Sequence, residues 1–255
     1  MKKKLWLILT LVLTSSLLAG CREFDKPITA ESTGFWNEFI VWPLVSVIAF
    51  FADHLGSFAF GIIVVTIIIR LIILPLTVKQ VKSSKQMQEI QPKLNELKEK
   101  YASKDAVTQQ KYQQEMMALM QDSGVNPLAG CLPVLIQMPI LLGFYHAISR
   151  MNAEGTIYDV GTFLSVPLGE SSILFAILAG LIQFVVLLTG PAMDNPQMKI
   201  MMYIMPIMII VFGSFLPAAL ALYWIVGNII SVIQNLVLHK PWNRKSKPTT
   251  GGAKK

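Results

Sequence analysis

Charged residues are scarce in this chain of 255 residues. Only 15% of them are Asp, Glu, Lys or Arg, whereas 53% are hydrophobic, and the mean hydropathy is +0.55. Soluble domains seldom have this composition, which favours a membrane protein with several spans. Cysteine is rarer still, since the chain has only Cys21 and Cys131. Because Cys131 falls inside a predicted span, a framework of disulfides is excluded.

Five segments are long and apolar enough to cross a bilayer as helices, which takes about 20 residues. They are residues 58–78, 127–147, 172–190, 200–215 and 217–238. None of them contains Asp or Glu. A sixth apolar stretch, 39–52 within the segment 21–57, has only about 14 residues, which favours an amphipathic helix in the membrane interface. We therefore predict an all-α integral membrane protein with five transmembrane helices.

Residues 1–20 have the features of a secretory signal peptide: three lysines, an apolar stretch and small residues near its end. The sequence Leu18-Ala19-Gly20-Cys21 also resembles a bacterial lipobox, in which the cysteine is acylated, for example with palmitate. We therefore expect a lipoprotein anchored at Cys21. The alternative is an ordinary signal anchor with a cysteine there by chance.

Basic residues between the spans indicate the orientation. The segment 79–126 holds eight lysines and the tail 239–255 holds six basic residues. The loop 148–171 holds one, Arg150, beside three acidic residues. By the positive-inside rule, 79–126 and the tail are cytoplasmic and 148–171 is outside. Five spans then place Cys21 outside the bacterial plasma membrane, where a lipid anchor must lie.

Residues 79–126 are expected to form a helical hairpin in the cytoplasm. Apolar residues recur there at helical spacing in two stretches. The first comprises Met87, Ile90, Leu94, Leu97 and Tyr101, and the second Tyr112, Met116, Leu119 and Met120. Between them, Asp105 has the chemistry of a helix N-cap. We predict that the two stripes pack on each other; a Met-rich surface for a partner is the alternative.

Arg70 lies in the middle of the span 58–78. An arginine at mid-membrane costs from ~2.5 to ~17 kcal/mol, depending on snorkelling and water defects. The helix between Arg70 and Lys79 measures roughly 12 Å, which is too deep for easy snorkelling. Because the five spans contain no carboxylate to neutralise the charge, we infer that water reaches Arg70 in a hydrophilic groove.

Further polar side chains occur in the spans, where such groups normally face a bundle interior or a wet cavity. The candidates for the lining of the groove, beside Arg70, are Thr66, Gln137, Gln183, Tyr223, Trp224, Asn228, Ser231 and Gln234. For each amide, the alternative is a hydrogen bond between helices, typically worth less than ~2 kcal/mol.

The string Asn126-Pro127-Leu128-Ala129-Gly130-Cys131-Leu132-Pro133, followed by Gln137-Met138-Pro139-Ile140, resembles the signature of the YidC/Oxa/Alb family of membrane protein insertases. Residues 217–228 resemble the last span of that family, and the lone arginine in the first span is a further similarity. The lipobox and the absence of a large extracytoplasmic domain resemble the Gram-positive bacterial branch. The resemblance implies a five-helix core around a groove that is open to the cytoplasm and to lipid, with Arg70 as its positive charge.

The resemblance also implies a function. Such a protein inserts, folds and helps assemble newly made membrane proteins, independently of the Sec translocon or together with it. The expected substrates are nascent proteins with one or two spans and acidic tails. The Sec translocon, the signal recognition particle receptor, the ribosome and acidic lipids are candidate partners, whereas DNA is not. The basic tail is suited to the phosphates of lipid or of ribosomal RNA.

Two other functions compete with insertion. A solute transporter or channel would use the same cavity, but the spans lack carboxylates for ion coupling and paired broken helices. An intramembrane enzyme is disfavoured because none of the three histidines lies beside a membrane serine in a plausible dyad. We expect no enzyme activity, no cofactor and no metal, and no G-x-x-x-x-G-K-[ST] motif for a nucleotide occurs.

Overall fold

The computed structural model describes residues 26–103, 105–125, 132–190 and 196–239. These ranges are mainly helical, which confirms the helical fold class. The helical elements are η2 (Asn37–Val41), α2 (Trp42–Leu55), α3 (Phe58–Lys100), α4 (Ala106–Asp122), α5 (Leu132–Met151), α6 (Ile173–Thr189), α7 (Pro196–Gly213) and α8 (Ala218–His239). The signal peptide, Cys21, residues 126–131 of the family-like string and residues 240–255 of the basic tail lie outside the described residues.

A small antiparallel ribbon interrupts the helical fold in the predicted outer loop. Strands β1 (Thr162–Phe163) and β2 (Val166–Pro167) pair with Thr162 opposite Pro167 and Phe163 opposite Val166. The same loop also pairs with the start of α8, because the backbone N–H of Ala219 donates to the carbonyl of Leu168 at 3.0 Å. The loop is thereby fastened to one end of the bundle.

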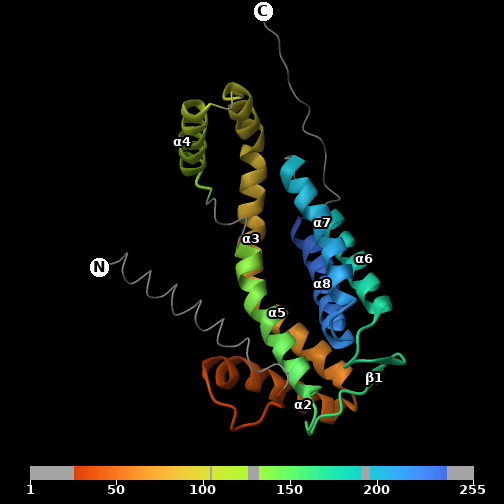
Figure 1. Cartoon of the computed structure of the whole chain (residues 1–255). Helices are drawn as coiled ribbons and strands as arrows, with labels where there is room; N and C mark the ends of the chain where they lie inside the picture. The colour runs from red at the N-terminus through yellow and green to blue at the C-terminus, as the bar shows by residue number, and fades with distance from the viewer. Residues whose placement is uncertain (1–25, 104, 126–131, 191–195, 240–255) are drawn as a thin grey trace, which may run out of the picture.

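Helix α3 is one continuous helix of 43 residues (Figure 1). It begins at the N-cap Ser57, whose hydroxyl accepts from the N–H of Ala59 at 3.2 Å. The predicted span 58–78 and the predicted hairpin segment that starts at residue 79 meet inside this helix, which has no break there. Pro75 and Pro92 both lie inside it. The apolar segment with Arg70 and the first arm of the predicted hairpin are therefore a single rod.

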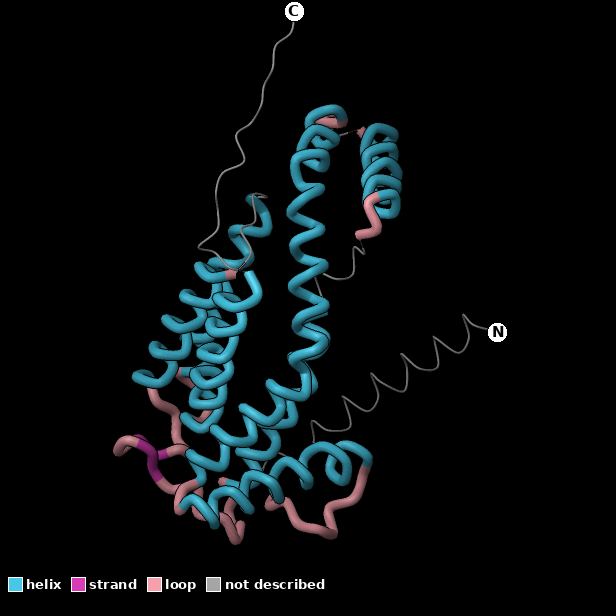
Figure 2. The backbone as a smooth tube through the Cα atoms, turned by 180° about the vertical axis from the view of Figure 1, so that it is seen from behind, coloured by secondary structure: helices cyan, strands magenta, loops and turns pink. Residues whose placement is uncertain are grey.

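Helix α4 lies beside the far end of α3, as Figures 1 and 2 show from opposite sides. The hairpin has its own small core, formed by residues of both predicted stripes and by Val125. The residues are Met87, Ile90, Leu94, Met116, Leu119, Met120 and Val125. The prediction that the stripes pack on each other is confirmed. Asp105 is the N-cap of α4 and accepts from the N–H of Thr108 at 2.8 Å, also as predicted.

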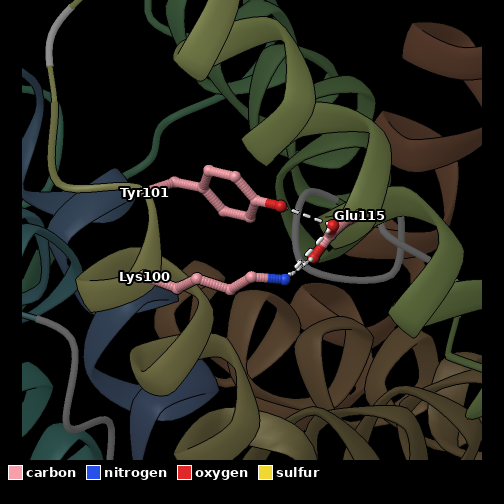
Figure 3. A network of polar contacts seen from close by, with 3 residues as sticks. All are labelled: Lys100, Tyr101 and Glu115. Atoms are coloured by element: carbon pink, nitrogen blue, oxygen red, sulfur yellow. Dashed lines mark hydrogen bonds and ion pairs between the residues drawn. The ribbon is translucent and has the colours of Figure 1, made fainter.

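A polar network near the turn of the hairpin joins α3 to α4 (Figure 3). Glu115 of α4 accepts a hydrogen bond from the hydroxyl of Tyr101 at 2.5 Å and pairs with Lys100 Nζ at 3.1 Å. The hydrogen bond from Tyr101, followed by that from Lys100, lowers the pKa of Glu115 below its usual range. The carboxylate is therefore the state that holds the two helices together here.

Helix α2 lies across the end of the bundle that is opposite the hairpin (Figures 1 and 2). Its buried residues Val45 and Ile48 belong to a core shared with α3, α5 and α8. The contact with α3 is close, because a Cβ on Gly61 would lie 2.5 Å from the carbonyl oxygen of Ile48. The helical stretch is longer than the predicted 39–52. Its position along the membrane surface stays a prediction.

Three of the described helical stretches are long and apolar enough to cross a membrane: Asn37–Leu55, Phe58–Lys100 and Ala218–Leu238. Two shorter apolar helices are Ile173–Thr189 and Met202–Gly213. Helix α6 packs on α7 and α8, and α8 also packs on α3. The contact of α6 with α7 depends on Gly180, where a side chain would collide with Ile210.

Arg150, at the end of α5, is buried and binds the segment that precedes η2. Its guanidinium donates to the carbonyls of Lys26 at 2.9 Å and Pro27 at 3.3 Å. It also donates to Asn37 Oδ1 at 2.7 Å and to Ser32 Oγ at 3.3 Å. The sequence shows Arg150 only as the single basic residue of the outer loop. In the fold, its hydrogen bonds join the C-terminal end of α5 to the segment at Lys26 and Pro27.

Acidification should loosen the hairpin. Because the folded pKa of Glu115 is lowered, its contribution is present above the ordinary glutamate range, near ~4.3, and is lost as the pH falls through the folded value. Hydrogen exchange of α4, corrected for its intrinsic pH dependence, should therefore rise at acidic pH. The variant Glu115→Gln should lose much of this response, whereas Glu96→Gln should keep it. A full response in Glu115→Gln would contradict the assignment.

Removing Arg150 should destabilise the fold. Arg150→Met keeps most of the side-chain volume but removes the donor that four acceptors share, the carbonyls of Lys26 and Pro27, Asn37 Oδ1 and Ser32 Oγ. We expect the free energy of unfolding to fall by about 2–5 kcal/mol. Thermal unfolding in detergent measures this change. The exposed residue Lys93 on α3 supplies the control Lys93→Met, and equal melting temperatures for the two variants would contradict the role of Arg150.

Candidate functional site

Arg70 projects from α3 against α8, where it meets Gly227. A Cβ built on Gly227 would lie 2.6 Å from Nη2, 3.3 Å from Nε and 3.4 Å from Cζ of Arg70. The guanidinium therefore rests on the backbone of α8 at a position without a side chain. Arg70 is partly exposed, which keeps part of its surface accessible.

Within residues 26–103, 105–125, 132–190 and 196–239, no group forms a hydrogen bond or an ion pair with Arg70. The hydroxyl of Tyr223 lies within electrostatic range of the guanidinium. A phenol is a weak counterpart for a full positive charge, because it is neutral at physiological pH. Arg70 thus has donors that the described protein leaves unused.

Gln137 and Tyr223, both predicted for the groove, bind each other. The side-chain amide of Gln137 donates to the hydroxyl of Tyr223 at 2.5 Å, which ties α5 to α8. The ring of Tyr223 stacks on Phe144, with centroids 4.3 Å apart and an angle of 27° between the planes. These contacts hold Tyr223 in place beside Arg70.

The predicted hydroxyl residues bond within their own helices. Thr66 is completely buried and donates to the carbonyl of Ile62 at 2.7 Å. Ser231 is half-buried and donates to the carbonyl of Gly227 at 2.9 Å. Both satisfy their donors without leaving α3 or α8.

Two amides of α8 bond to the same neighbouring helix, α6. Asn228 is buried and donates to the carbonyl of Ala179 in α6 at 3.3 Å. Asn235, seven residues later, donates to Val186 of α6 at 3.1 Å. These are hydrogen bonds between helices, which is the alternative that the sequence left open for Asn228. The remaining candidates, Gln183, Trp224 and Gln234, are half-buried.

Two residues of this region make contacts that the sequence did not predict. Gly227 shares the polar arc of its helix but offers no side chain that points to a role. Lys85, counted only as a loop charge, donates to the carbonyl of Leu238 at 2.8 Å. A lysine at the C-terminus of a helix satisfies a free carbonyl and the negative end of the helix dipole. Lys85 therefore joins α3 to the last turn of α8.

Comparison with known proteins identifies the family. The model of the family described as 60Kd inner membrane protein matches residues 50–246. The membrane protein insertase MisCA of Bacillus subtilis (strain 168) is 49% identical, and the match covers 100% of this chain and 99% of that protein. The chain belongs to the YidC family of membrane protein insertases. The membrane protein insertase YidC 2 of Bacillus anthracis is 48% identical and is matched over the full length of both chains.

A solved YidC structure agrees with the fold. The crystal structure of an active YidC insertase with its first transmembrane domain resolved matches with a TM-score of 0.61 at 27% identity. The match covers 79% of this chain and 46% of that chain, so this chain spans less than half of it. Membership of the YidC family, with close relatives from Bacillus, confirms the resemblance to the Gram-positive branch and supports a membrane protein insertase of the bacterial membrane. The transporter alternative finds no support in these matches.

A double-mutant cycle should detect the hydrogen bond between Gln137 and Tyr223 as a coupling in the free energy of unfolding. Tyr223→Phe keeps the stack on Phe144 but leaves the amide of Gln137 without its acceptor, so we expect a loss of about 1–2 kcal/mol in stability. Gln137→Leu should have a similar cost. The double variant Gln137→Leu/Tyr223→Phe should cost no more than one single change, because both partners leave together. Thermal unfolding in detergent tests this, and strictly additive losses would argue against the bond.

Proposed function

We propose that this YidC-family insertase moves newly made membrane proteins into lipid through a hydrated groove whose positive charge is Arg70. The predicted five spans correspond to the first part of α3 (58–78) and to α5, α6, α7 and α8. The observation that carries the proposal is that Arg70 is partly exposed and lacks an acidic or hydrogen-bonding partner among the described residues. A guanidinium in an apolar helix is retained most readily where water and a transient anion can reach it.

The substrates that suit such a site are proteins with one or two spans and short acidic tails. The acidic tail would rest in the groove beside Arg70, where it stays hydrated. Its apolar segment would then leave for the lipid, gaining ~0.3–0.6 kcal/mol per strongly hydrophobic residue. An acidic tail that moves outward also gains about 2.3 kcal/mol per charge for each 100 mV of membrane potential. These contributions make insertion possible without a nucleotide.

The length of α6 supports a thinned bilayer beside the groove. Its 17 residues span about 26 Å, which is shorter than a hydrocarbon core of ~30 Å. A short helix draws the two lipid surfaces together at a modest cost. The polar tail of a substrate would therefore cross a shorter apolar distance here than in undisturbed lipid.

The two ends of the bundle support the predicted orientation. The lysine-bearing end of α3 meets the last turn of α8 through Lys85, so the region 79–126 and the tail from residue 239 start on the same side. We assign this side to the cytoplasm. The opposite end carries α2, the loop 148–171 and the segment from Lys26, which Arg150 binds (Figure 1). That end would face outward, closed to substrate, with the lipid anchor on Cys21.

Partners follow from the same assignment. The hairpin of α3 and α4 and the basic tail would meet the ribosome, the signal recognition particle receptor or acidic lipids. The Sec translocon would join for larger substrates. Among the remaining predicted lining residues, Gln137, Trp224, Gln183 and Gln234 would add polar surface to the groove.

Removing the positive charge of Arg70 tests the proposal. In liposomes with purified protein, Arg70→Ala should abolish most insertion of a single-span substrate with an acidic tail, because the attraction for the tail is lost. Arg70→Lys should retain a large part of it, since it preserves the charge. The same substrate with Asp and Glu replaced by Asn and Gln should respond weakly to either change. Equal insertion by all three proteins would overturn the role of Arg70.

A further inference from the structure

Gly227 occupies the centre of the face of α8 that meets Arg70. Residues four apart on a helix lie above one another, so Tyr223, Gly227 and Ser231 form one line along this face. The middle member has no side chain, which leaves a notch between a phenol and a hydroxyl. We propose that Gly227 is a positioning residue, which seats the guanidinium of Arg70 so that its donors stay directed to an incoming carboxylate. This inference rests on the function proposed above.

The fit of the guanidinium to the notch excludes any other residue in this arrangement. Gly227 is buried, and a Cβ there would come within 2.6 Å of Nη2 of Arg70. Carbon and nitrogen atoms without a bond between them need about 3.5 Å. Even alanine would therefore push the end of Arg70 away from α8. The side chain is long and flexible, so it would move rather than disrupt the packing of the helices.

The notch gives the guanidinium room, but the carbonyl of Gly227 does not accept a hydrogen bond from it. The carbonyl of Gly227 already accepts the hydroxyl of Ser231 at 2.9 Å. In an α-helix the same carbonyl also accepts the backbone N–H four residues later. A carbonyl oxygen has two lone pairs, and here both have a donor. The guanidinium consequently rests on α8 without using its own N–H groups on this carbonyl.

Tyr223, which lies beside the notch, is held in place by its neighbours. Tyr223 is 2% exposed, stacks on Phe144 and accepts the amide of Gln137. Its hydroxyl oxygen therefore already has a donor other than Arg70. The carbonyl of Gly227 is fully used, the hydroxyl of Tyr223 accepts from Gln137, and neither bonds to Arg70. The planar fork of Arg70 is therefore left for a ligand that accepts two parallel hydrogen bonds. A carboxylate has that geometry, which the side chains of an acidic tail supply.

The test compares Gly227→Ala with Gly143→Ala in liposomes. Gly143 on α5 is a matched control, because it is also buried and a Cβ there would meet the end of a side chain, Ile40 Cγ2, at 3.0 Å. Each protein is assayed with the acidic-tailed substrate and with its neutral counterpart, and its melting temperature is measured. We expect Gly227→Ala to lower insertion of the acidic substrate about five- to tenfold, a typical effect for a displaced interaction. Its melting temperature and its insertion of the neutral substrate should match those of Gly143→Ala.

A second background separates positioning from packing. A lysine ends in a compact ammonium on a flexible stem and has no fork to be seated. In Arg70→Lys, the added change Gly227→Ala should therefore have little further effect on the acidic substrate. An equal loss in both backgrounds, or an equal loss for both substrates with a lower melting temperature, would overturn the inference in favour of a packing role.

The outcomes also distinguish this inference from the proposed function. If Arg70→Ala inserts the acidic substrate as well as the unchanged protein does, the function of Arg70 fails, whatever Gly227→Ala does. If Arg70→Ala impairs insertion and Gly227→Ala does not, the groove charge stands and the role of Gly227 is overturned.

Discussion

The positive charge of Arg70 lies inside an apolar helix, and the surrounding helices accommodate it without a carboxylate. Helix α8 contributes a bare stretch of backbone at Gly227 and a tyrosine whose oxygen is already engaged by Gln137. Such an arrangement tolerates the charge, and no described residue uses its hydrogen-bonding capacity. A structural ion pair would have stabilised the arginine but would also have neutralised the site. In the function proposed here, the unpaired charge is the condition under which an acidic tail can be bound and released.

The continuity of α3 connects this site to the predicted cytoplasmic side. One helix carries Arg70 in its apolar part and Lys85 in its polar part, and Lys85 binds the last turn of α8. The first arm of the hairpin thus extends the helix that carries Arg70, and the hairpin has its own small core of leucine, isoleucine, valine and methionine.

The opposite end is held by different means. Arg150 donates to the backbone carbonyls of Lys26 and Pro27, while the outer loop bonds to the start of α8. Two arginines of the same chain therefore play contrasting parts. Arg150 uses its donors within the protein and stabilises the fold, whereas Arg70 has none of them engaged by a described residue.

Local patterns predicted several elements well. The helical stripes of 79–126 predicted two helices that pack on each other, because apolar spacing of three and four residues has few other solutions. The cap at Asp105 was also predictable, since its chemistry is local. The continuity of α3 was not, because a change from apolar to charged residues marks a change of solvent and does not break a helix. The short ribbon of β1 and β2 gave no period-two signal at two residues per strand.

The candidate site shows the same division. Arg70 stood out in the sequence because a permanent charge in an apolar run has a large cost wherever it lies. Gln137 and Tyr223 were predicted individually, but their bond joins residues 86 positions apart, and no local pattern encodes it. Asn228 was predicted for the groove lining, but its bond to α6 could not be predicted, since a helix wheel gives a direction and not a neighbour.

By itself, the sequence determined the helical class, the family and the arginine without an acid in its spans, because composition and motifs are properties of the chain alone. The tertiary structure decided which groups meet that arginine. Gly227 acquires a role only once α3 lies against α8, since the absence of a side chain has consequences only where another atom occupies the space.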